Sequence, residues 1–308
     1  MTKVFIDGSS GTTGLRIHER LKERNDIELL SIPYDLRHDV QVRKDMMSRA
    51  DIVFLCLPDA ASKELMDTCD DLNTVIIDTA TIHRTSPGWT YGLPEITGRE
   101  KIASSKKIAN PGCHATGFVV LIEPLVKAGL LNPETFLTCL SLTGYSGGGK
   151  KMIHQYETED DPLLKAPRMY GTSQNHKHLP EMLAYTGMKT VPAFIPVVGN
   201  FYSGMETVIP ISKKDLNGSM SDIQTLYRNT YHDSIIHYEE ANDENGFFSS
   251  SKYEGRDDME VCVGGNDERI LLIARFDNLG KGACGSAIEN MNLVLHLPAD
   301  TSLVVKGV

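Results

Sequence analysis

The sequence predicts an α/β protein whose first domain is a doubly wound parallel sheet and whose second domain is α+β. Three observations carry this prediction. Strand and helix patterns alternate over the first 110 residues, a glycine-rich turn follows the first strand, and longer strand patterns replace the alternation after residue 112. The chain has 308 residues, and at about 150 residues per domain it is long enough for two domains.

The first domain follows from the order of its apolar segments. The run 52–57 is continuously apolar and stops at Pro58, which is typical of a parallel strand that is covered on both faces. Strands and helices in the order βαβαβ predict a parallel sheet with helices on both sides. We predict strands at 4–6, 27–32, 52–57 and 74–78, and helices at 15–24, 40–49 and 60–68.

The second domain begins after Asn110-Pro111-Gly112, where the pattern changes. An apolar helix is predicted from Cys113 to about residue 128, tolerating Pro124, and the charged stretch 158–174 is expected to be an irregular surface loop. The longer strands predict a mainly antiparallel sheet. We predict strands at 136–143, 191–198, 206–211 and 270–276, and helices at 222–231 and 287–295.

Composition and charge exclude several classes of protein. The sequence is 41% hydrophobic and 23% charged, which argues against a collagen-like, disordered or disulfide-dense chain. Lys and Arg total 31 against 41 Asp and Glu, for a net charge of −10. Because no basic stripe offsets this charge, nucleic acid and acidic membrane surfaces are poor candidates as partners.

The six cysteines and the N-terminal residues indicate a reduced compartment. No two cysteines form a C-x-x-C pair or have zinc-site spacing, so we expect thiols and no metal. The first residues lead directly into a predicted core strand, which leaves no room for a signal peptide, and no apolar run approaches 18 residues. We therefore expect a cytoplasmic protein.

A glycine motif directly follows the first predicted strand and opens the first helix. It has the form G-x-x-G-x-x-G, one residue different from the commonest dinucleotide fingerprint. Small residues let the backbone approach a pyrophosphate at a helix N-terminus, although the same motif could be only a tight turn. Because the motif follows the first strand of a βαβ run, we favour a role in nucleotide binding over a tight turn alone. The candidate cofactor-binding residues are Gly8, Ser10, Gly11, Thr12, Thr13 and Gly14.

The choice between NAD and NADP stays open from these residues. The loop after the second strand contains both Asp35 and Arg37. An acidic residue there would suit the ribose hydroxyls of NAD, and an arginine would suit the 2′-phosphate of NADP. Arg37 could equally be a solvated loop residue.

Cys113 is the sharpest local signal. It lies at the head of the apolar helix, where the helix dipole and unpaired N–H groups favour the thiolate that covalent acyl chemistry needs. We expect the other five cysteines to be core residues, with Cys284 as the only competitor because it also precedes a helix. His114 is a weak candidate base, since neighbours on a helix point about 100° apart.

Two further groups could bind an anionic substrate. The cluster His176-Lys177-His178-Leu179-Pro180-Glu181 could hold a metal, bind an anion or be a solvated loop, and the metal lacks further ligands at recognisable spacing. Arg84 follows the strand that ends at Asp78, and a guanidinium at the carboxyl edge of a parallel sheet could grip a carboxylate or phosphate. A surface salt bridge is the alternative for Arg84.

Taken together, these motifs resemble the N-acetyl-γ-glutamyl-phosphate reductase family of arginine biosynthesis, in its shorter form. The resemblance covers essentially the whole chain. Asn-Pro-Gly-Cys together with His-x-His-x-Pro-Glu at this separation is specific to the family. The five motifs are Gly8 to Gly14, Trp89 to Glu95, Asn110 to Cys113, His176 to Glu181 and Asp277 to Gly282.

The resemblance implies a fold similar to aspartate-semialdehyde dehydrogenase. A Rossmann-type NADP-binding domain would comprise residues 1–112, completed by 286–308, and a catalytic and dimerisation domain would comprise 113–285. The cofactor would be NADP(H), and the chain would form homodimers or homotetramers. The partner molecule would be a small acyl phosphate.

The resemblance also implies residue roles. Cys113 would be the nucleophile and His176 the acid and base, while Thr143 would line the substrate pocket and Asn278 would approach the nicotinamide. The residues that would hold substrate or orient the imidazole are Arg84, Tyr170, His178 and Glu181.

The chain departs from the family pattern at four positions. Thr143 replaces a serine, His114 replaces a tyrosine, His83 replaces a phenylalanine, and Leu179 replaces a small polar residue. None of these changes removes a catalytic group, but they bear on the shape of the pocket.

The hypothesis is therefore reductive dephosphorylation of N-acetyl-glutamyl 5-phosphate through a thioester on Cys113. One alternative is a related reductase that acts on aspartyl phosphate or a carrier-bound aminoadipyl phosphate. A non-catalytic NADP-binding sensor would need neither Cys113 nor His176, and a cysteine hydrolase would leave the glycine motif without a purpose.

Overall fold

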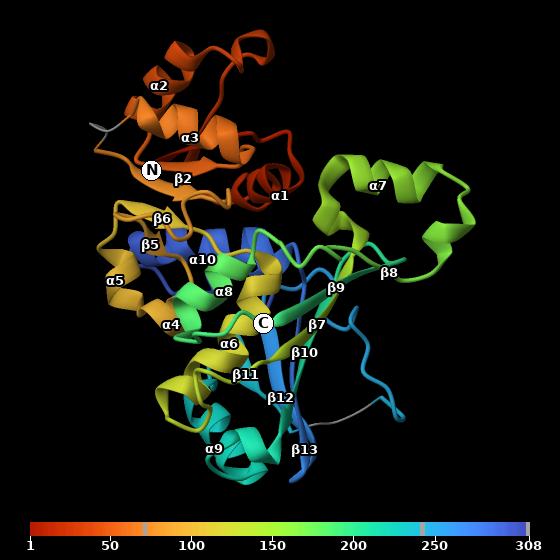
Figure 1. Cartoon of the computed structure of the whole chain (residues 1–308). Coiled ribbons are helices and arrows are strands. Elements are labelled where there is room, and N and C mark those ends of the chain that lie inside the picture. The colour runs from red at the N-terminus through yellow and green to blue at the C-terminus, as the bar shows by residue number, and fades with distance from the viewer. Residues whose placement is uncertain (70–72, 241–243, 306–308) are drawn as a thin grey trace. The chain divides into compact units, whose positions relative to one another are not determined.

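The computed structural model describes residues 1–69, 73–240 and 244–305, which form two compact units. The first unit contains Met1–Pro111 and Ala283–Leu303, and the second contains Gly112–Gly282 together with Val304 and Val305 (Figure 1). The last helix of the chain thus belongs to the same unit as the N-terminal residues. The cofactor and catalytic roles of the two predicted domains stay a prediction.

A six-stranded sheet forms the centre of the first unit, in the order β2-β1-β3-β4-β6-β5. Every neighbouring pair of strands is parallel. The predicted doubly wound parallel sheet is therefore confirmed. The strands are β1 (Thr2–Asp7), β2 (Ile27–Leu30), β3 (Ile52–Leu55), β4 (Val75–Asp78), β5 (Thr90–Tyr91) and β6 (Lys107–Ala109).

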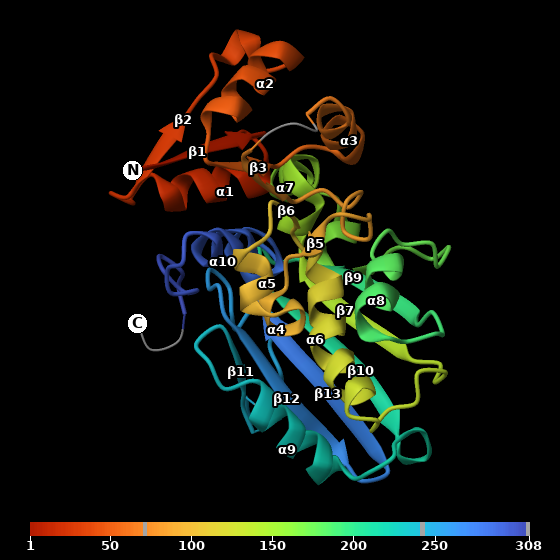
Figure 2. The same cartoon turned by 90° about the vertical axis from the view of Figure 1, so that its left-hand side faces the viewer.

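Helices cover the strands of this sheet, with α2 and α3 on one side and α1 and α10 on the other (Figure 2). The core of this unit includes Phe5 from β1, Val53 from β3 and Leu65 from α3. The helices are α1 (Thr12–Leu21), α2 (Val40–Arg49), α3 (Asp59–Asp67), α4 (Pro94–Thr97), α5 (Arg99–Ala103) and α10 (Gly285–Val294).

Helix α1 begins three residues earlier than the predicted Leu15. Gly11 is its N-cap in an extended conformation, and Gly14, Ile17 and Leu21 form its buried face. These residues are three, four and seven positions apart, as one face of a helix requires. The last three residues of the glycine motif therefore form the first turn of α1, whereas the sequence pattern predicted that the helix begins after the motif.

A seven-stranded sheet forms the centre of the second unit, in the order β11-β12-β13-β10-β7-β9-β8. Four neighbouring pairs are antiparallel, and the pairs β11-β12 and β7-β9 are parallel. The sheet is mixed and mainly antiparallel, as predicted. Its strands are β7 (Thr138–Gly144), β8 (Arg168–Met169), β9 (Ala193–Gly199), β10 (Met205–Ser212), β11 (Ile236–Tyr238), β12 (Met259–Asn266) and β13 (Arg269–Phe276).

The predicted surface loop 158–174 is not wholly irregular. It contains a 3-10 turn, Pro162–Lys165, and the short strand β8, which pairs with β9. Strands β8, β11 and β12 were not predicted, because the first two are short and β12 contains Glu260 and two glycines that break the apolar pattern.

Helices of the second unit pack on one face of its sheet, where Figure 1 shows α6, α8 and α9. Nearly every residue of α6 from His114 to Leu125 is buried, so this helix is the centre of the unit's core. Helices α7 and α8 were not predicted. The helices are α6 (Cys113–Lys127), α7 (Gly149–Thr158), α8 (Leu179–Thr186) and α9 (Met220–Thr230).

Within the described residues, no helix is long and apolar enough to cross a membrane.

Candidate active site

The glycine motif forms a turn that only glycine can make at two positions. Gly8 has φ +83°, and a Cβ there would lie 2.3 Å from the carbonyl oxygen of Cys56. A Cβ at Gly14 would lie 2.4 Å from the carbonyl oxygen of Gly8. The N–H of Gly11 donates to the carbonyl of Gly8 at 2.9 Å, which closes the turn. The backbone is thereby held close to the N-terminus of α1.

A cavity of about 520 Å³ lies beside this turn in the first unit. Gly8, Ser10 and Gly11 line it, whereas Thr12, Thr13 and Gly14 form the first turn of α1. The Thr12 Oγ1 atom is buried and has no hydrogen-bond partner among the described residues. An unpartnered hydroxyl, a glycine turn and a helix N-terminus fit the phosphates of a dinucleotide.

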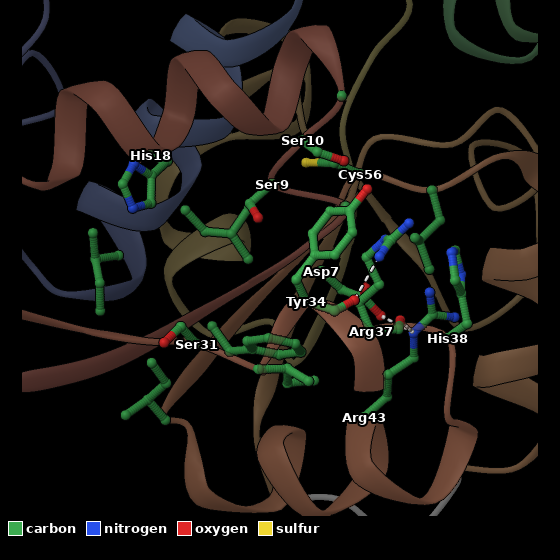
Figure 3. A pocket seen from close by; sticks show the side chains of 18 of the residues that line it. Asp7, Ser9, Ser10, His18, Ser31, Tyr34, Arg37, His38, Arg43 and Cys56 are labelled. Atoms are coloured by element: carbon green, nitrogen blue, oxygen red, sulfur yellow. Dashed lines mark hydrogen bonds and ion pairs between the residues drawn. The ribbon is translucent and has the colours of Figure 1, made fainter.

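One wall of the cavity is basic. Figure 3 shows Arg37, His38 and Arg43 together beside Tyr34. The Arg37 guanidinium lies 3.5 Å from the centroid of the Tyr34 ring and donates to the Tyr34 carbonyl at 2.5 Å. Asp35, the acidic alternative, is in the 3-10 turn Tyr34–Leu36 and does not belong to the cavity lining.

Arg43 of this wall interacts with Asp7, which also lines the cavity. The Arg43 Nε atom lies 3.4 Å from the Asp7 carboxylate and donates to the Arg37 carbonyl at 2.7 Å. Burial raises the pKa of Asp7, and the charge of Arg43 acts against that shift. His38 and Arg43 were not predicted: Asp35 and Arg37 were the candidates in the loop after the second strand, and Arg43 lies outside that loop, on α2.

Cys56 is not the core residue that was predicted. It is half-buried and lines the cavity, one residue beyond the end of β3. The apolar run 52–57 suggested a strand that continues through Cys56, but the chain leaves the sheet to pass Gly8. Burial raises the pKa of this thiol to about 12, so it is not an activated nucleophile. Cys284, the predicted competitor of Cys113, is buried at the start of α10.

Cys113 is the first residue of α6 and is half-buried. Gly112 is the N-cap of the helix, and its N–H donates to the Glu181 carboxylate at 2.8 Å. A Cβ at Gly282 would lie 2.9 Å from the Cβ of Cys113, so glycine there lets the motif Asp277 to Gly282 approach the thiol. The turn that presents Cys113 is therefore fixed by both α8 and the glycine-rich motif.

The histidine cluster is an ordered part of the fold. His178 and Glu181 are buried, and α8 begins at Leu179, so the solvated-loop interpretation is wrong for these two side chains. His176 is partly buried, and its Nδ1 atom accepts a 3.2 Å bond from the His178 N–H. Burial, with a smaller effect of Lys177, lowers the pKa of His176 and favours its neutral form. No group of three or more metal-ligating side chains was found in the described parts of the chain.

His114 lies behind this cluster and bonds to Tyr170. Its Nε2 atom is 2.7 Å from the Tyr170 hydroxyl and its Nδ1 atom is 2.8 Å from the Ser141 hydroxyl. Burial lowers the pKa of His114 to about 3, with a smaller effect of His176. His114 is thus a neutral residue whose two ring nitrogens are both hydrogen-bonded, and its low pKa makes it a poor base.

Thr143 and Asn278 are both buried in the second unit. Thr143 is near the end of β7. The Asn278 side-chain oxygen accepts from the Gly204 N–H at 3.0 Å, and its amide nitrogen donates to the Ser146 hydroxyl at 3.0 Å. These bonds fix the orientation of the Asn278 amide.

Arg84 is a buried residue of the first unit, which excludes the surface salt bridge. Its Nε atom donates to the Asn110 carbonyl at 2.9 Å and an Nη atom donates to the Thr79 carbonyl at 3.0 Å. These two backbone carbonyls fix the orientation of the guanidinium.

Sequence reasoning missed the group that supports the turn of Arg84. His83 Nδ1 lies 2.5 Å from the Asp78 carboxylate, which also accepts from the Ser62 hydroxyl at 2.7 Å. The His83 ring stacks on Trp89, with centroids 4.1 Å apart. Both residues belong to motifs that were noted, but their contact depends on the turn between β4 and β5.

Two family models match the chain. Residues 3–105 match the NAD binding domain of semialdehyde dehydrogenase, and residues 113–278 match its dimerisation domain. A relative from Rhizobium etli named N-acetyl-gamma-glutamyl-phosphate reductase is 42% identical over 95% of this chain and 98% of its own. This chain belongs to that reductase family, within the semialdehyde dehydrogenases. The predicted recognition is therefore confirmed.

Further comparisons agree with this assignment. A relative from a Nostoc species, named N-acetyl-gamma-glutamyl-phosphate reductase 2, is 37% identical over 98% of this chain and 99% of its own. The structure of aspartate semialdehyde dehydrogenase II from Vibrio cholerae has a TM-score of 0.73, with 17% identity over 96% of this chain and 99% of that one.

The corresponding enzyme from Candida albicans, solved with NADP, has a TM-score of 0.66 at 14% identity, and covers 98% of this chain and 100% of that one. The two solved structures show a shared fold. The family is one of oxidoreductases, and its first domain binds a nicotinamide dinucleotide.

Proposed function

We propose that this chain uses NADPH to reduce N-acetyl-γ-glutamyl phosphate to N-acetylglutamate semialdehyde with release of phosphate, as a step of arginine biosynthesis. The observation that carries the proposal is Cys113 at the N-terminus of α6, where Glu181 and Gly282 fix the turn that presents the thiol. The names of the relatives supply the substrate.

Cys113 forms the covalent intermediate. Its neutral partner His176 takes the thiol proton, and the resulting thiolate attacks the carbon of the acyl phosphate. Phosphate leaves with the electron pair of the C–O bond, and a thioester to Cys113 forms. The lowered pKa of His176 supports this first role as a base.

His176 then carries the same proton into the second half of the reaction. A bound nicotinamide cofactor supplies the hydride that reduces the thioester carbon. His176, now an imidazolium, protonates the oxygen that gains charge at that carbon. Collapse of the hemithioacetal returns the proton to His176, expels the Cys113 thiolate and releases the aldehyde.

Substrate recognition is assigned to oriented charges and hydroxyls. We propose that Arg84 binds an anionic group of the substrate and that Asn278 positions the nicotinamide. The substrate pocket is proposed to include Thr143, Tyr170, His178 and Glu181. Buried, hydrogen-bonded side chains of this kind hold their geometry without reorganising during the reaction.

NADPH is the proposed reductant because the cavity beside the glycine turn has a basic wall. Arg37, His38 and Arg43 would surround the 2′-phosphate, and the turn residues Gly8 to Gly14 would hold the pyrophosphate. NADH has no 2′-phosphate to interact with this basic wall. The reaction needs a reduced Cys113 thiol, which suits the cytoplasm.

A second copy of the chain is the proposed partner of the open face of the second sheet. Leu140 pairs with Ile195 and Val208, and Leu142 pairs with Val197, so these side chains share one face. All five are only partly buried. Glu206, which pairs with Leu142, lies on the same face. A largely apolar sheet face in a chain that matches a dimerisation domain supports a dimer, or a tetramer built from dimers.

A purified-enzyme assay tests the function. NADPH oxidation is followed with N-acetyl-γ-glutamyl phosphate, aspartyl phosphate and a carrier-bound aminoadipyl phosphate in parallel, and each is repeated with NADH. We expect turnover with the first substrate and NADPH, loss of turnover by more than about 10³-fold in Cys113→Ser, and retained NADPH binding.

The matched control is Cys69→Ala, a core cysteine of the first unit, which should retain turnover. Faster turnover of another acyl phosphate would reassign the substrate. Absence of any NADPH oxidation that depends on Cys113 would reject the enzyme and favour a sensor.

A further inference from the structure

We propose that Gln174 is a positioning residue for His176, and that its side-chain amide holds the segment carrying this imidazole against β9. The proposal rests on the acid and base role of His176 proposed above. Gln174 is an exposed residue outside the predicted site. It acts through the position of the histidine and does not touch the reacting atoms in this scheme.

The Gln174 amide forms a pair of hydrogen bonds with the backbone of Phe194 on β9. The Phe194 N–H donates to Gln174 Oε1 at 2.8 Å, and Gln174 Nε2 donates to the Phe194 carbonyl at 2.7 Å. Because a backbone N–H only donates and a carbonyl only accepts, these partners assign the two ends of the amide. One side chain thus satisfies both backbone groups of a strand residue. We call this pair of bonds the amide bridge.

The amide bridge takes the place of a neighbouring strand at the edge of the second sheet. Strand β8 pairs with β9 through Arg168–Met169, and the Tyr170 N–H then donates to the Pro196 carbonyl at 3.0 Å. Phe194 lies two residues from Pro196, so its N–H and carbonyl point to the same edge of β9. Backbone groups at a sheet edge need partners, and Gln174 supplies them where the chain has turned away from β9.

The segment between these two attachments is a turn with two left-handed residues. Gly171 has φ +64° and Gln174 has φ +55°, and the Gln174 N–H donates to the Gly171 carbonyl at 3.0 Å. This region is sparsely populated by residues other than glycine and asparagine, so glutamine is held there at a cost. The side chain of asparagine is one methylene shorter. The amide bridge is therefore what glutamine adds at this position.

His176 lies between the amide bridge and the start of α8, and contacts on both sides hold it. Its ring meets the Phe194 ring edge-on, at 5.0 Å between centroids, and a Cβ at Gly171 would lie 3.8 Å from His176 Cδ2. On the other side, the Leu179 N–H donates to the His176 carbonyl at 3.0 Å, and the His178 N–H donates to His176 Nδ1 at 3.2 Å. The residue whose backbone Gln174 binds is thus the one whose ring packs on the imidazole.

Loss of the amide would release this segment from one of its two attachments to β9. The remaining attachment, at Tyr170, lies six residues before His176. The imidazole would then shift relative to the Phe194 ring. A displacement of about 1 Å in a reacting group can cost about 10²-fold in rate, whereas a substitution at an exposed side chain changes global stability little.

Titratable groups face His176 from several elements, and none of them is changed in the test. The rings of His114, Tyr170 and His178 lie 5.8 Å, 5.8 Å and 4.8 Å from its ring between centroids. Burial lowers the pKa of His176, with a smaller effect of Lys177. The pH midpoint of this imidazole therefore reports where the ring lies among its neighbours.

Three substitutions at Gln174 separate the amide bridge from the backbone conformation. Gln174→Asn and Gln174→Gly suit φ +55° better than glutamine does, and both lose the bridge. Gln174→Ala also loses the bridge but keeps the strained backbone. The matched control is Ser302→Asn, because Ser302 is another exposed residue with positive φ, +62°, and lies in neither the turn nor the predicted site.

The readout that needs no substrate is the NMR titration of the His176 Cε1–H resonance in the full-length protein, assigned with His176→Asn. We expect all three Gln174 variants to shift this resonance and to raise its pH midpoint toward the ordinary value of about 6.5, because the ring becomes less buried. Ser302→Asn should leave the resonance and its midpoint unchanged.

The reductase assay measures the effect on the reaction. The value of kcat should fall at least about tenfold in all three Gln174 variants while KM changes less than about twofold, because a misplaced acid and base slows the chemical steps. Urea denaturation should rank the same variants differently. Gln174→Ala should be the least stable, because it alone combines the lost bridge with a strained backbone.

Two results would overturn the proposal. One is a His176 midpoint and a kcat in Gln174→Asn equal to those of the unsubstituted protein, which would mean that the turn holds the histidine without the bridge. The other is a loss of kcat confined to Gln174→Ala, which would follow stability alone. Because the titration needs no substrate, a chain that showed the expected shifts but lacked reductase activity would refute only the proposed function.

Discussion

The hydroxyl of Tyr231 donates a 2.6 Å hydrogen bond to the carbonyl of Val120. Val120 is four residues before Pro124, and proline has no N–H to complete that helical bond. The tyrosine after α9 therefore supplies the donor that the proline removes. A proline inside the most buried helix of the unit is tolerated for this reason.

Replacing Tyr231 by phenylalanine should therefore destabilise the protein. We expect the free energy of unfolding to fall by about 1–3 kcal/mol, because a buried carbonyl loses its donor. In a Pro124→Ala background the restored N–H should reduce this cost to less than half. Urea denaturation of the four proteins measures the coupling, and an equal cost in both backgrounds would contradict the explanation.

The turn of the glycine motif predicts a sharp difference between two glycines of nearly equal φ. Gly8 has φ +83° and Gly88 has φ +81°, but a Cβ meets the Cys56 carbonyl at Gly8 and nothing within 4 Å at Gly88. Gly88→Ala should cost about 1 kcal/mol of unfolding free energy. Gly8→Ala should cost more and abolish NADPH binding, as followed by cofactor fluorescence. Retained binding in Gly8→Ala would refute the role of the turn.

The basic wall of the cavity predicts the cofactor preference. Arg37→Ala should raise the dissociation constant of NADPH at least tenfold, about 1.4 kcal/mol, and change that of NADH less than about twofold. Arg49→Ala is the control, since Arg49 is exposed at the other end of α2 and does not line the cavity. Titration calorimetry with both cofactors decides, and an equal loss for NADPH and NADH would argue against a 2′-phosphate site.

His114 predicts a pH dependence of stability. Its pKa is about 3 in the folded protein and about 6.5 in an unfolded chain. Because the pKa of His114 is lower in the folded protein, its contribution to the free energy of unfolding is fully present above pH 6.5. This contribution is lost as the pH falls, because the unfolded chain then binds a proton that the folded protein does not. Between pH 6 and 4, His114 should lower the free energy of unfolding by about 1.4 kcal/mol for each pH unit of acidification.

His114→Gln should remove this contribution while the carboxylates titrate as before. Urea denaturation at several pH values should therefore show a shallower decline for the variant than for the unsubstituted protein. Identical slopes would mean that His114 accepts a proton in the native state.

The open face of the second sheet predicts the oligomeric state. Leu142→Asp places a charge at the centre of this face, and burying it in a dimer would be unfavourable. We expect a monomer by light scattering at concentrations where the unsubstituted protein is a dimer. Leu163→Asp is the control, because Leu163 is 69% exposed in the segment before β8 and lies outside the face. A dimeric Leu142→Asp would place the interface elsewhere.

Local patterns were sufficient for the parallel sheet of the first unit and for the position of Cys113 at a helix N-terminus. The alternation of strands and helices predicts the parallel sheet, because apolar periodicity and helix length are encoded in neighbouring residues. Cys113 could be found because a Pro-Gly turn before an apolar helix marks a helix N-terminus in the sequence itself. The resemblance to a family then supplied His176, Arg84 and Glu181, which their own patterns left open.

What the sequence by itself determined was the alternation of strands and helices in the first unit, the glycine turn and the position of Cys113 at a helix N-terminus. Only the tertiary structure decided that Cys56 lines a cavity, that His178 and Glu181 are buried, and that the segment before α8 brings Tyr170 to His114. These facts depend on which surfaces distant segments present to each other. His114 and Tyr170 are 56 residues apart in the chain, and their hydrogen bond leaves no periodic pattern in the sequence between them from which it could be predicted.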